Sequence, residues 1–246
     1  MSDKWLYYFC RMGDHYAFIS YDDGVGETIN QVAPNQLLRL RLRFKNPRES
    51  GFPSSEEYPA LNALEEELRD LAREHGALFV GEFSVAGARQ FHVYTRDSQE
   101  AWSPRLQALG QRHGYDLECS VKADENREGY WKDLYPTEED RHMIEDLRVI
   151  AGLREEGDNT DARRRVDHWA YFSSDAAAER FCQWARESGY RLEASGKDED
   201  ERYRVRVFHE GSMHWQDITS HTISVRRKAI ELGGDYDGWE TEVCKA

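Results

Sequence analysis

Long hydrophobic runs are missing from this 246-residue sequence. The longest uninterrupted apolar stretch spans residues 5–10, whereas a helix that crosses a bilayer needs about 20 such residues. The N-terminus also lacks the basic segment followed by a longer apolar one that is typical of a secretory signal. We therefore expect no membrane span and a cytoplasmic location.

Cysteine is scarce, and its spacing contains no paired motif. The sequence has 4 cysteines, and no two of them form a CxxC pair. Disulfide frameworks and structural zinc sites require closely spaced or clustered cysteines. We therefore expect free thiols, at least two of them serving as small core residues. The four positions are Cys10, Cys119, Cys182 and Cys244.

Positive charge is in deficit. The 33 Lys and Arg residues are outnumbered by 47 Asp and Glu residues, which gives a formal net charge of -14. Duplex DNA is bound by a basic field that neutralises phosphates, so this balance argues against a protein that wraps DNA. An acidic protein that neutralises a toxin by charge mimicry, like an immunity protein, is an alternative that rests on this charge alone.

Catalytic and cofactor motifs are also absent. The sequence contains no GxSxG elbow, no P-loop and no complete dinucleotide-binding glycine pattern. His209 and His214 are one residue too far apart for a zinc-protease helix, and Gly211 between them favours a loop. Asp167 and His168 are neighbours on a predicted strand and point to opposite faces, so they form no acid/base pair. We predict no catalytic residues, no cofactor and no metal site, and hence a protein that is not an enzyme.

Two small domains fit the length better than one thick core, because 39% of the residues are hydrophobic and 33% are charged. A weak internal repeat supports this division. The sequence HGYDLE at residues 113–118 is echoed by SGYRLE at residues 188–193. In each copy the glycine follows a helical pattern and suits a helix C′ position, and the tyrosine begins a strand-like pattern.

Each half of the sequence reads as strand, helix, strand, strand, helix, strand. The pattern predicts an α+β protein with two ferredoxin-like βαββαβ sandwiches in tandem, the first with an extra N-terminal β-hairpin. We expect the first domain over residues 1–122, a polar linker over residues 123–136, and the second domain over residues 137–246 with a leading helix.

One predicted sheet face combines aromatic and basic side chains. Trp169 and Tyr171 share a face of the first strand of the second unit. The neighbouring strand carries arginine at every second position, in Arg202, Arg204 and Arg206. RNA-recognition modules stack bases and hold phosphates in this way. Direct RNA binding through these residues is therefore one hypothesis, and burial of the aromatic rings against a protein partner is another.

Several motifs of the second half resemble the bacterial RraB family, regulators of ribonuclease E activity. These motifs are the strand Asp-His-Trp-x-Tyr-Phe at residues 167–172, the terminal Tyr-Asp-Gly-Trp at residues 236–239, and a helix that ends in Glu-Gly-Asp at residues 156–158. The first half, with Gly-Phe-Pro-Ser-Ser-Glu-Glu at residues 51–57 and a Leu-rich helix after it, is similar to the bacterial domain of unknown function 695.

The resemblance to RraB implies a small protein without catalytic residues of its own that binds the endoribonuclease and inhibits RNA cleavage. It adds a specific partner to the hypotheses above, namely ribonuclease E or its complex. Aromatic residues dominate interface energetics, and the first and last strands of the predicted sheet are adjacent. We therefore expect the partner surface on these two strands. Its predicted residues are Trp169, Tyr171, Tyr236, Asp237 and Trp239.

Overall fold

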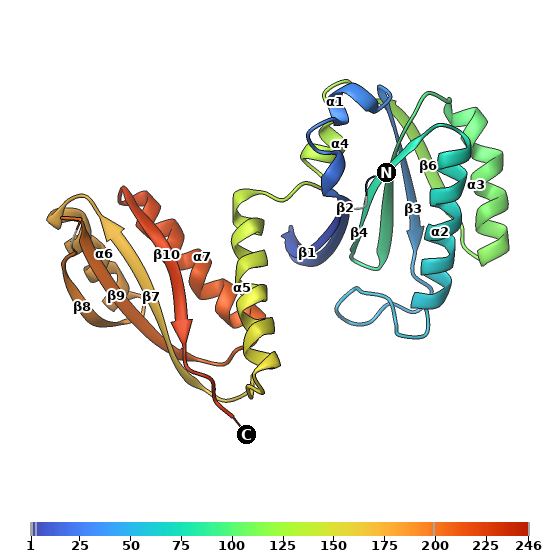
Figure 1. Ribbon diagram of the computed structural model, residues 1–246. Coiled ribbons are helices and arrows are strands. Elements are labelled where there is room, and N and C mark those ends of the chain that lie inside the picture. Colours follow the sequence, from blue (N-terminus) through green and yellow to red (C-terminus); the bar gives the residue numbers. More distant parts are fainter. Residues whose placement is uncertain (1, 3, 199, 246) are drawn as a thin grey trace. The chain divides into compact units, whose positions relative to one another are not determined.

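The structure, a computed structural model, describes residues 2, 4–198 and 200–245. The chain divides into two compact units, residues 1–141 and 142–246. Each unit combines helices with one antiparallel sheet (Figure 1), which confirms the prediction of a mixed α+β protein. Among the described residues, no helix has the length and apolar character that crossing a membrane requires.

The first unit contains a six-stranded sheet in the order β1-β2-β4-β5-β3-β6. Its strands are β1 (Trp5–Met12), β2 (His15–Asp22), β3 (Gln36–Arg43), β4 (Leu78–Val85), β5 (Ala88–Thr95) and β6 (Leu117–Ala123). Its helices are α1 (Ile29–Val32), α2 (Tyr58–Glu74), α3 (Gln99–His113) and α4 (Glu128–Trp131), with a 3-10 turn over Asp23–Val25. The hairpin of β1 and β2 extends the sheet beyond β4.

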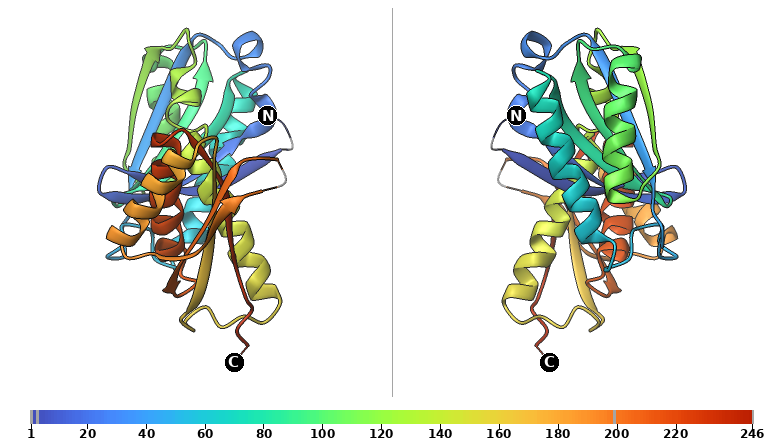
Figure 2. Two further views of the ribbon diagram at one scale, coloured as in Figure 1. Left: turned by 90° about the vertical axis from the view of Figure 1, so that its left-hand side faces the viewer. Right: turned by 90° about the vertical axis from the view of Figure 1, so that its right-hand side faces the viewer.

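Helices α2 and α3 lie side by side on one face of the first sheet (Figure 2). The leucines of α2 recur at spacings of three and four, so one stripe of the helix faces the sheet. Leu61, Leu64 and Leu68 on this stripe are fully buried. They pack with Trp102 of α3 and with Leu40 of β3 in one core. Each buried leucine contributes about 1.5 to 3 kcal/mol.

Residues 123–136, which the sequence predicts as a linker, instead pack into the first unit. Tyr130 and Leu134 are fully buried there. The buried Arg127 guanidinium donates to the backbone carbonyl of Ala33 at 2.7 Å. The prediction was wrong because polar side chains in this stretch satisfy buried backbone groups, a use that composition alone does not distinguish from solvent exposure.

The second unit contains a four-stranded sheet in the order β10-β7-β9-β8. Its strands are β7 (Arg164–Phe172), β8 (Arg191–Lys197), β9 (Tyr203–Gly211) and β10 (Gly234–Thr241). Its helices are α5 (Glu138–Glu155), whose first turn precedes the division between the units, α6 (Asp175–Glu187) and α7 (Trp215–Glu231). The order places the first and last strands of the unit side by side.

Helices α6 and α7 cover the same face of this sheet (Figure 1). Strand side chains alternate between faces, so Ala170 and Phe172 of β7 point toward these helices. Phe181 of α6 and Val225 of α7 complete the core on this face. A smaller apolar cluster joins α5 to Val166 on the same side of β7. We call this side the covered face.

Candidate functional site

The opposite side of the second sheet, here called the open face, carries the side chains that alternate with the covered core. Trp169 and Tyr171 of β7 are half-buried on this face. Register pairs Trp169 with Arg206 and Tyr171 with Arg204 across β7 and β9. The hydrophobic cores that α5, α6 and α7 form use the other side of the strands. The open face is therefore the surface that this unit leaves available to a partner.

Arginine side chains stack on both aromatic rings of the open face. The Arg206 guanidinium lies 4.6 Å from the centroid of the Trp169 ring, and that of Arg204 lies 5.5 Å from it. Arg202 covers Tyr171 in the same way, at 4.5 Å. Such cation–π contacts are worth about 0.5 to 1 kcal/mol at exposed sites. The structure thus brings together all five predicted aromatic and basic residues, which lie on β7, on β9 and, for Arg202, directly before β9.

Carboxylates neutralise much of the positive charge on the open face. Asp167 accepts hydrogen bonds from Arg165 and from Arg206, the latter at 2.9 Å. Glu240 of β10 forms a second ion pair with Arg206, at 3.1 Å. Burial raises the pKa of Asp167, but the hydrogen bonds from the two arginines outweigh this and hold its pKa below the usual value. Asp167 is therefore a fixed anion between two guanidinium groups.

Arg204 differs from the other arginines of the open face. Arg202 is paired with Asp198 at 3.0 Å, and Arg206 has its two carboxylates. Within the part of the chain that the structure describes, Arg204 has no ion-pair partner, and its side chain is exposed. A charge that is already neutralised adds little to binding, so Arg204 is the arginine on this face most available to an anionic group.

The predicted partner surface is divided between the two faces of the sheet. Tyr236 and Trp239 lie on the covered face, opposite Ala170 and His168 in the register. An odd number of positions separates Tyr236 from Trp239, so in a regular strand their side chains would point to opposite faces. A bulge between Tyr236 and Gly238 brings both side chains to the covered face. The two rings therefore cannot join Trp169 on one docking surface.

The covered-face aromatic residues are tied into the unit by hydrogen bonds. The Trp239 indole N–H donates to Asp146 Oδ1 of α5 at 2.8 Å, and the Thr222 hydroxyl donates to the other oxygen of the same carboxylate at 2.6 Å. Burial raises the pKa of Asp146, while these two hydrogen bonds oppose that rise. Trp239 thus links β10 to α5 and, through Asp146, to α7. Asp237 remains exposed in the bulge.

Three histidines, of which His168 and His209 are buried and His221 is half-buried, form a cluster on the covered face that the sequence reasoning did not find. His168 Nε2 lies 3.0 Å from His209 Nδ1, and His168 Nδ1 lies 2.9 Å from the Tyr236 hydroxyl. The ring of His221 stacks on that of His209 with centroids 3.6 Å apart. The Tyr190 hydroxyl is 2.9 Å from His221 Nδ1. The signal was available in the alternation of β7 and β9, because His168 and His209 occupy the face of each strand that otherwise holds mostly apolar residues.

Burial keeps these histidines neutral. Burial, followed by the neighbouring histidines, lowers the pKa of His168 to about 3, and burial followed by His221 lowers that of His209 to about 4. Burial also lowers the pKa of His221. Within residues 2, 4–198 and 200–245, no three His, Cys, Asp or Glu side chains are grouped to hold a metal ion. The cluster is thus a hydrogen-bonded part of the core.

Comparison with protein families gives two matches that do not overlap. Residues 3–135 match the family described as "Family of unknown function (DUF695)". Residues 143–241 match the family described as "Regulator of ribonuclease activity B", RraB. The second match contains the whole sheet of the second unit, and with it both the open and the covered face.

Among curated proteins, none matches this sequence. Among solved structures, a proposed glycine cleavage system transcriptional repressor has 9% identity and a TM-score of 0.22, with 84% of this chain and 98% of that chain covered. Protein BT0572 from Bacteroides thetaiotaomicron has 10% identity and a TM-score of 0.19, with 84% and 93% covered. At these TM-scores, neither structure supports a fold or a function.

Proposed function

Because this chain belongs to the DUF695 family through residues 3–135 and matches RraB over residues 143–241, we propose that it is a non-enzymatic cytoplasmic regulator that binds a ribonuclease and restrains its cleavage of RNA. The proposed partner is an endoribonuclease of the E type or its complex. The proposed contact surface is the open face of the second unit.

The observation that carries this proposal is the grouping of Trp169, Tyr171 and Arg204 on a rigid sheet face. Trp, Tyr and Arg are the residue types that dominate the energetics of protein interfaces. The paired strands and the guanidinium groups stacked on the rings restrict the side chains before binding. Such preorganisation reduces the entropy that association must offset.

The strand orders support a ferredoxin-like assignment of both units, which we propose as their fold. In the second unit the order β10-β7-β9-β8 corresponds to the fourth, first, third and second strands of a βαββαβ series. In the first unit, β6-β3-β5-β4 has the same order, and the hairpin of β1 and β2 is added at its edge. We propose that the two units are separate domains, of which the second binds the ribonuclease.

The test is inhibition of a purified ribonuclease E-type enzyme by the full chain. We expect the wild-type protein to slow RNA cleavage and Arg204→Glu to lower its inhibitory potency at least tenfold, equivalent to about 1.4 kcal/mol. Arg180→Glu is the matched control, because Arg180 is an exposed arginine on α6, which packs on the covered face. The proposal fails if the wild-type protein neither binds nor inhibits the enzyme, or if the two variants behave alike.

Direct RNA binding is the second candidate, because the arginine and aromatic side chains lie on one face of a four-stranded sheet. It predicts that a labelled single strand binds the protein alone, with an affinity that falls as salt rises, and that Arg204→Glu abolishes this binding. No binding at low salt would exclude it and leave ribonuclease inhibition untouched.

A further inference from the structure

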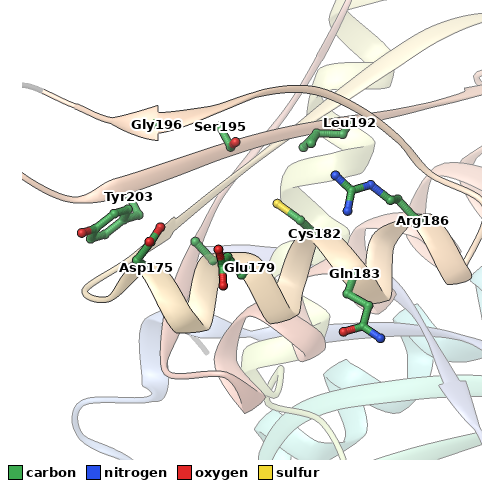
Figure 3. A pocket seen from close by; sticks show the side chains of 10 residues that line it. Asp175, Glu179, Cys182, Gln183, Arg186, Leu192, Ser195, Gly196 and Tyr203 are labelled. Carbon is green, nitrogen blue, oxygen red and sulfur yellow. The ribbon is translucent and has the colours of Figure 1, made fainter.

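A groove of about 620 Å³ runs along one edge of the second sheet, between α6 and β8 (Figure 3). It opens on the covered side and is therefore separate from the surface assigned to the ribonuclease. Most of its lining comes from two elements, with Asp175, Glu179, Cys182 and Arg186 on α6 and Leu192 and Ser195 on β8, and Tyr203 at the start of β9 completes it.

The strand that forms one wall is an edge strand. Strand β8 pairs with β9 on one side and is the last strand in the order of the sheet. Its middle residues, Ala194, Ser195 and Gly196, are small, uncharged and exposed. An edge strand presents unpaired N–H and C=O groups, and proteins usually guard it with charges, prolines or bulges. Both edge strands have a register irregularity, between Leu192 and Ala194 in β8 and between Tyr236 and Gly238 in β10. After its irregularity β8 presents the uncharged stretch 194–196, whereas β10 has exposed acidic residues.

The floor of the groove is apolar. Ala178 and Cys182 are buried beneath it, and Leu192 is half-buried. Burial raises the pKa of the Cys182 thiol, so the groove holds a neutral sulfur instead of a reactive thiolate. These features suit an apolar side chain and do not suit covalent chemistry.

The charges at the rim lie at opposite ends of the groove. Figure 3 shows Asp175 beside Tyr203 at one end, Glu179 next along α6 below Ser195, and Arg186 near Leu192 at the other end. All three side chains are exposed, and in the described part of the chain none of them has an ion-pair partner. Eleven helical positions separate Asp175 from Arg186, a rise of about 16 Å. An extended chain covers that distance in about five residues.

We propose that the edge of β8 binds an extended segment of a partner protein as a fifth strand of the sheet. Main-chain hydrogen bonds to the edge of β8 would supply affinity, and alternate side chains would enter the groove. The segment would place a basic residue at Asp175 and Glu179, apolar residues over Cys182, and an acidic residue at Arg186.

Charge disfavours a second copy of this chain as the occupant. In a symmetric antiparallel pairing of two β8 strands over their full length, Arg191 of one copy would lie opposite Lys197 of the other. Like charges directly opposite each other destabilise a strand pair, here partly offset by the ion pairs of Arg191 with Glu210 and of Lys197 with Glu201. A heterologous segment with the charges described above avoids this repulsion.

The probe is a fluorescent seven-residue peptide that is capped at both termini and has the sequence Lys-Thr-Val-Thr-Val-Thr-Glu. We expect saturable binding to the full chain by fluorescence anisotropy, with amide exchange slowed in residues 191–197. Ser195→Trp fills the groove and is expected to weaken binding at least tenfold. Ala194→Trp is the matched control, because Ala194 is exposed on the same strand and does not line the groove; we expect a change of less than about twofold.

Two further measurements keep the test decisive if Ser195→Trp does not fold. Glu179→Arg, on the exposed side of α6, is expected to weaken binding of the lysine-bearing peptide about threefold or more. A peptide N-methylated at alternate amides cannot form the strand ladder and is expected not to bind. No saturable binding up to about 1 mM peptide, equal effects of both tryptophan variants, or a dimer of this chain that Ser195→Trp dissociates would overturn the proposal.

Discussion

The covered and open faces of the second sheet use neighbouring residues of the same strands in opposite ways. On β7, His168 turns inward to a hydrogen-bonded network with His209 and Tyr236, whereas Trp169 turns outward beneath two guanidinium groups. On the covered face, polar aromatic groups have their hydrogen-bond partners inside the unit. On the open face, the arginines next to the aromatic rings are exposed or half-exposed. The comparison predicts that stability depends on the covered face and recognition on the open face.

Acidification is expected to have the largest effect, and it acts on the covered face. The folded-state pKa values of His168 and His209, about 3 and about 4, lie below the usual 6.5. Below pH 6.5 the unfolded chain therefore binds protons that the native unit does not. The stabilisation from the neutral histidines is fully present above that pH and is lost as the pH drops toward 4. Each of these histidines lowers the free energy of unfolding by about 1.4 kcal/mol per pH unit. For two histidines over two pH units, the expected loss is on the order of 3 to 5 kcal/mol.

Urea unfolding at a series of pH values measures this loss, and hydrogen exchange assigns it to the second unit. The His168→Gln variant should show a shallower pH dependence than the wild type. His15→Gln, at an exposed position of the first unit, is the control and should leave the slope unchanged. An unaltered slope in His168→Gln would contradict the assignment of the pH response to the cluster.

Replacement of the two tryptophans compares the faces directly. Trp239→Ala removes a partly buried ring that packs against the apolar cluster of α5 and leaves the buried Asp146 with one donor fewer, so we expect a loss of about 3 kcal/mol in the free energy of unfolding. Trp169→Ala removes a half-exposed ring and should lose about 1 kcal/mol. Chemical denaturation followed by circular dichroism gives both values, and similar losses would mean that the faces are not distinct.

A single hydroxyl group provides a finer comparison. Tyr236→Phe deprives the buried His168 Nδ1 of its partner and is expected to reduce stability by about 1 to 2 kcal/mol. Tyr171→Phe should change stability by less than about 0.5 kcal/mol, because within the described residues the Tyr171 hydroxyl has no hydrogen-bond partner. Thermal unfolding of the two variants beside the wild type is sufficient, and an equal decrease in both would contradict the proposed division.

The smallest expected effect concerns the open face. Asp167→Asn removes the carboxylate shared by Arg165 and Arg206, and we expect a loss of about 0.5 to 1 kcal/mol at low salt. Because this contribution is electrostatic and both arginine partners are half-exposed, the difference from wild type should shrink in about 1 M salt. Urea unfolding at the two salt concentrations measures it, and a loss that is independent of salt would mean that Asp167 acts through packing.

Local signals in the sequence were sufficient for much of the secondary structure. The glycines of the internal repeat, Gly114 and Gly189, have φ values of 71° and 87° and follow α3 and α6 as predicted. These are left-handed positions that glycine adopts without a steric penalty. The turn between β4 and β5 lies at Ala86 and Gly87, also with positive φ. Such features depend on a few adjacent residues, so the sequence specifies them.

The candidate site was only partly predictable, because its division depends on non-local geometry. Alternation along one strand and period-two arginines on the next correctly grouped Trp169 and Tyr171 with the arginines. Alternation could not place Tyr236 and Trp239, since the intervening bulge near Gly238 shifts the register by one residue. The partnership of Asp146 with Trp239 joins residues that are 93 positions apart, and no local pattern indicates such a contact.

The link from α5 to the sheet has a practical consequence. Since the Asp146 carboxylate holds both Trp239 and Thr222, and Ile150 packs with Val166 and Ile218, the helix is an integral part of the second unit. A truncated gene intended to yield this half alone should therefore begin at or before residue 137. Likewise, any recombination event that transferred this half to another protein would have to carry α5 along to produce a foldable product.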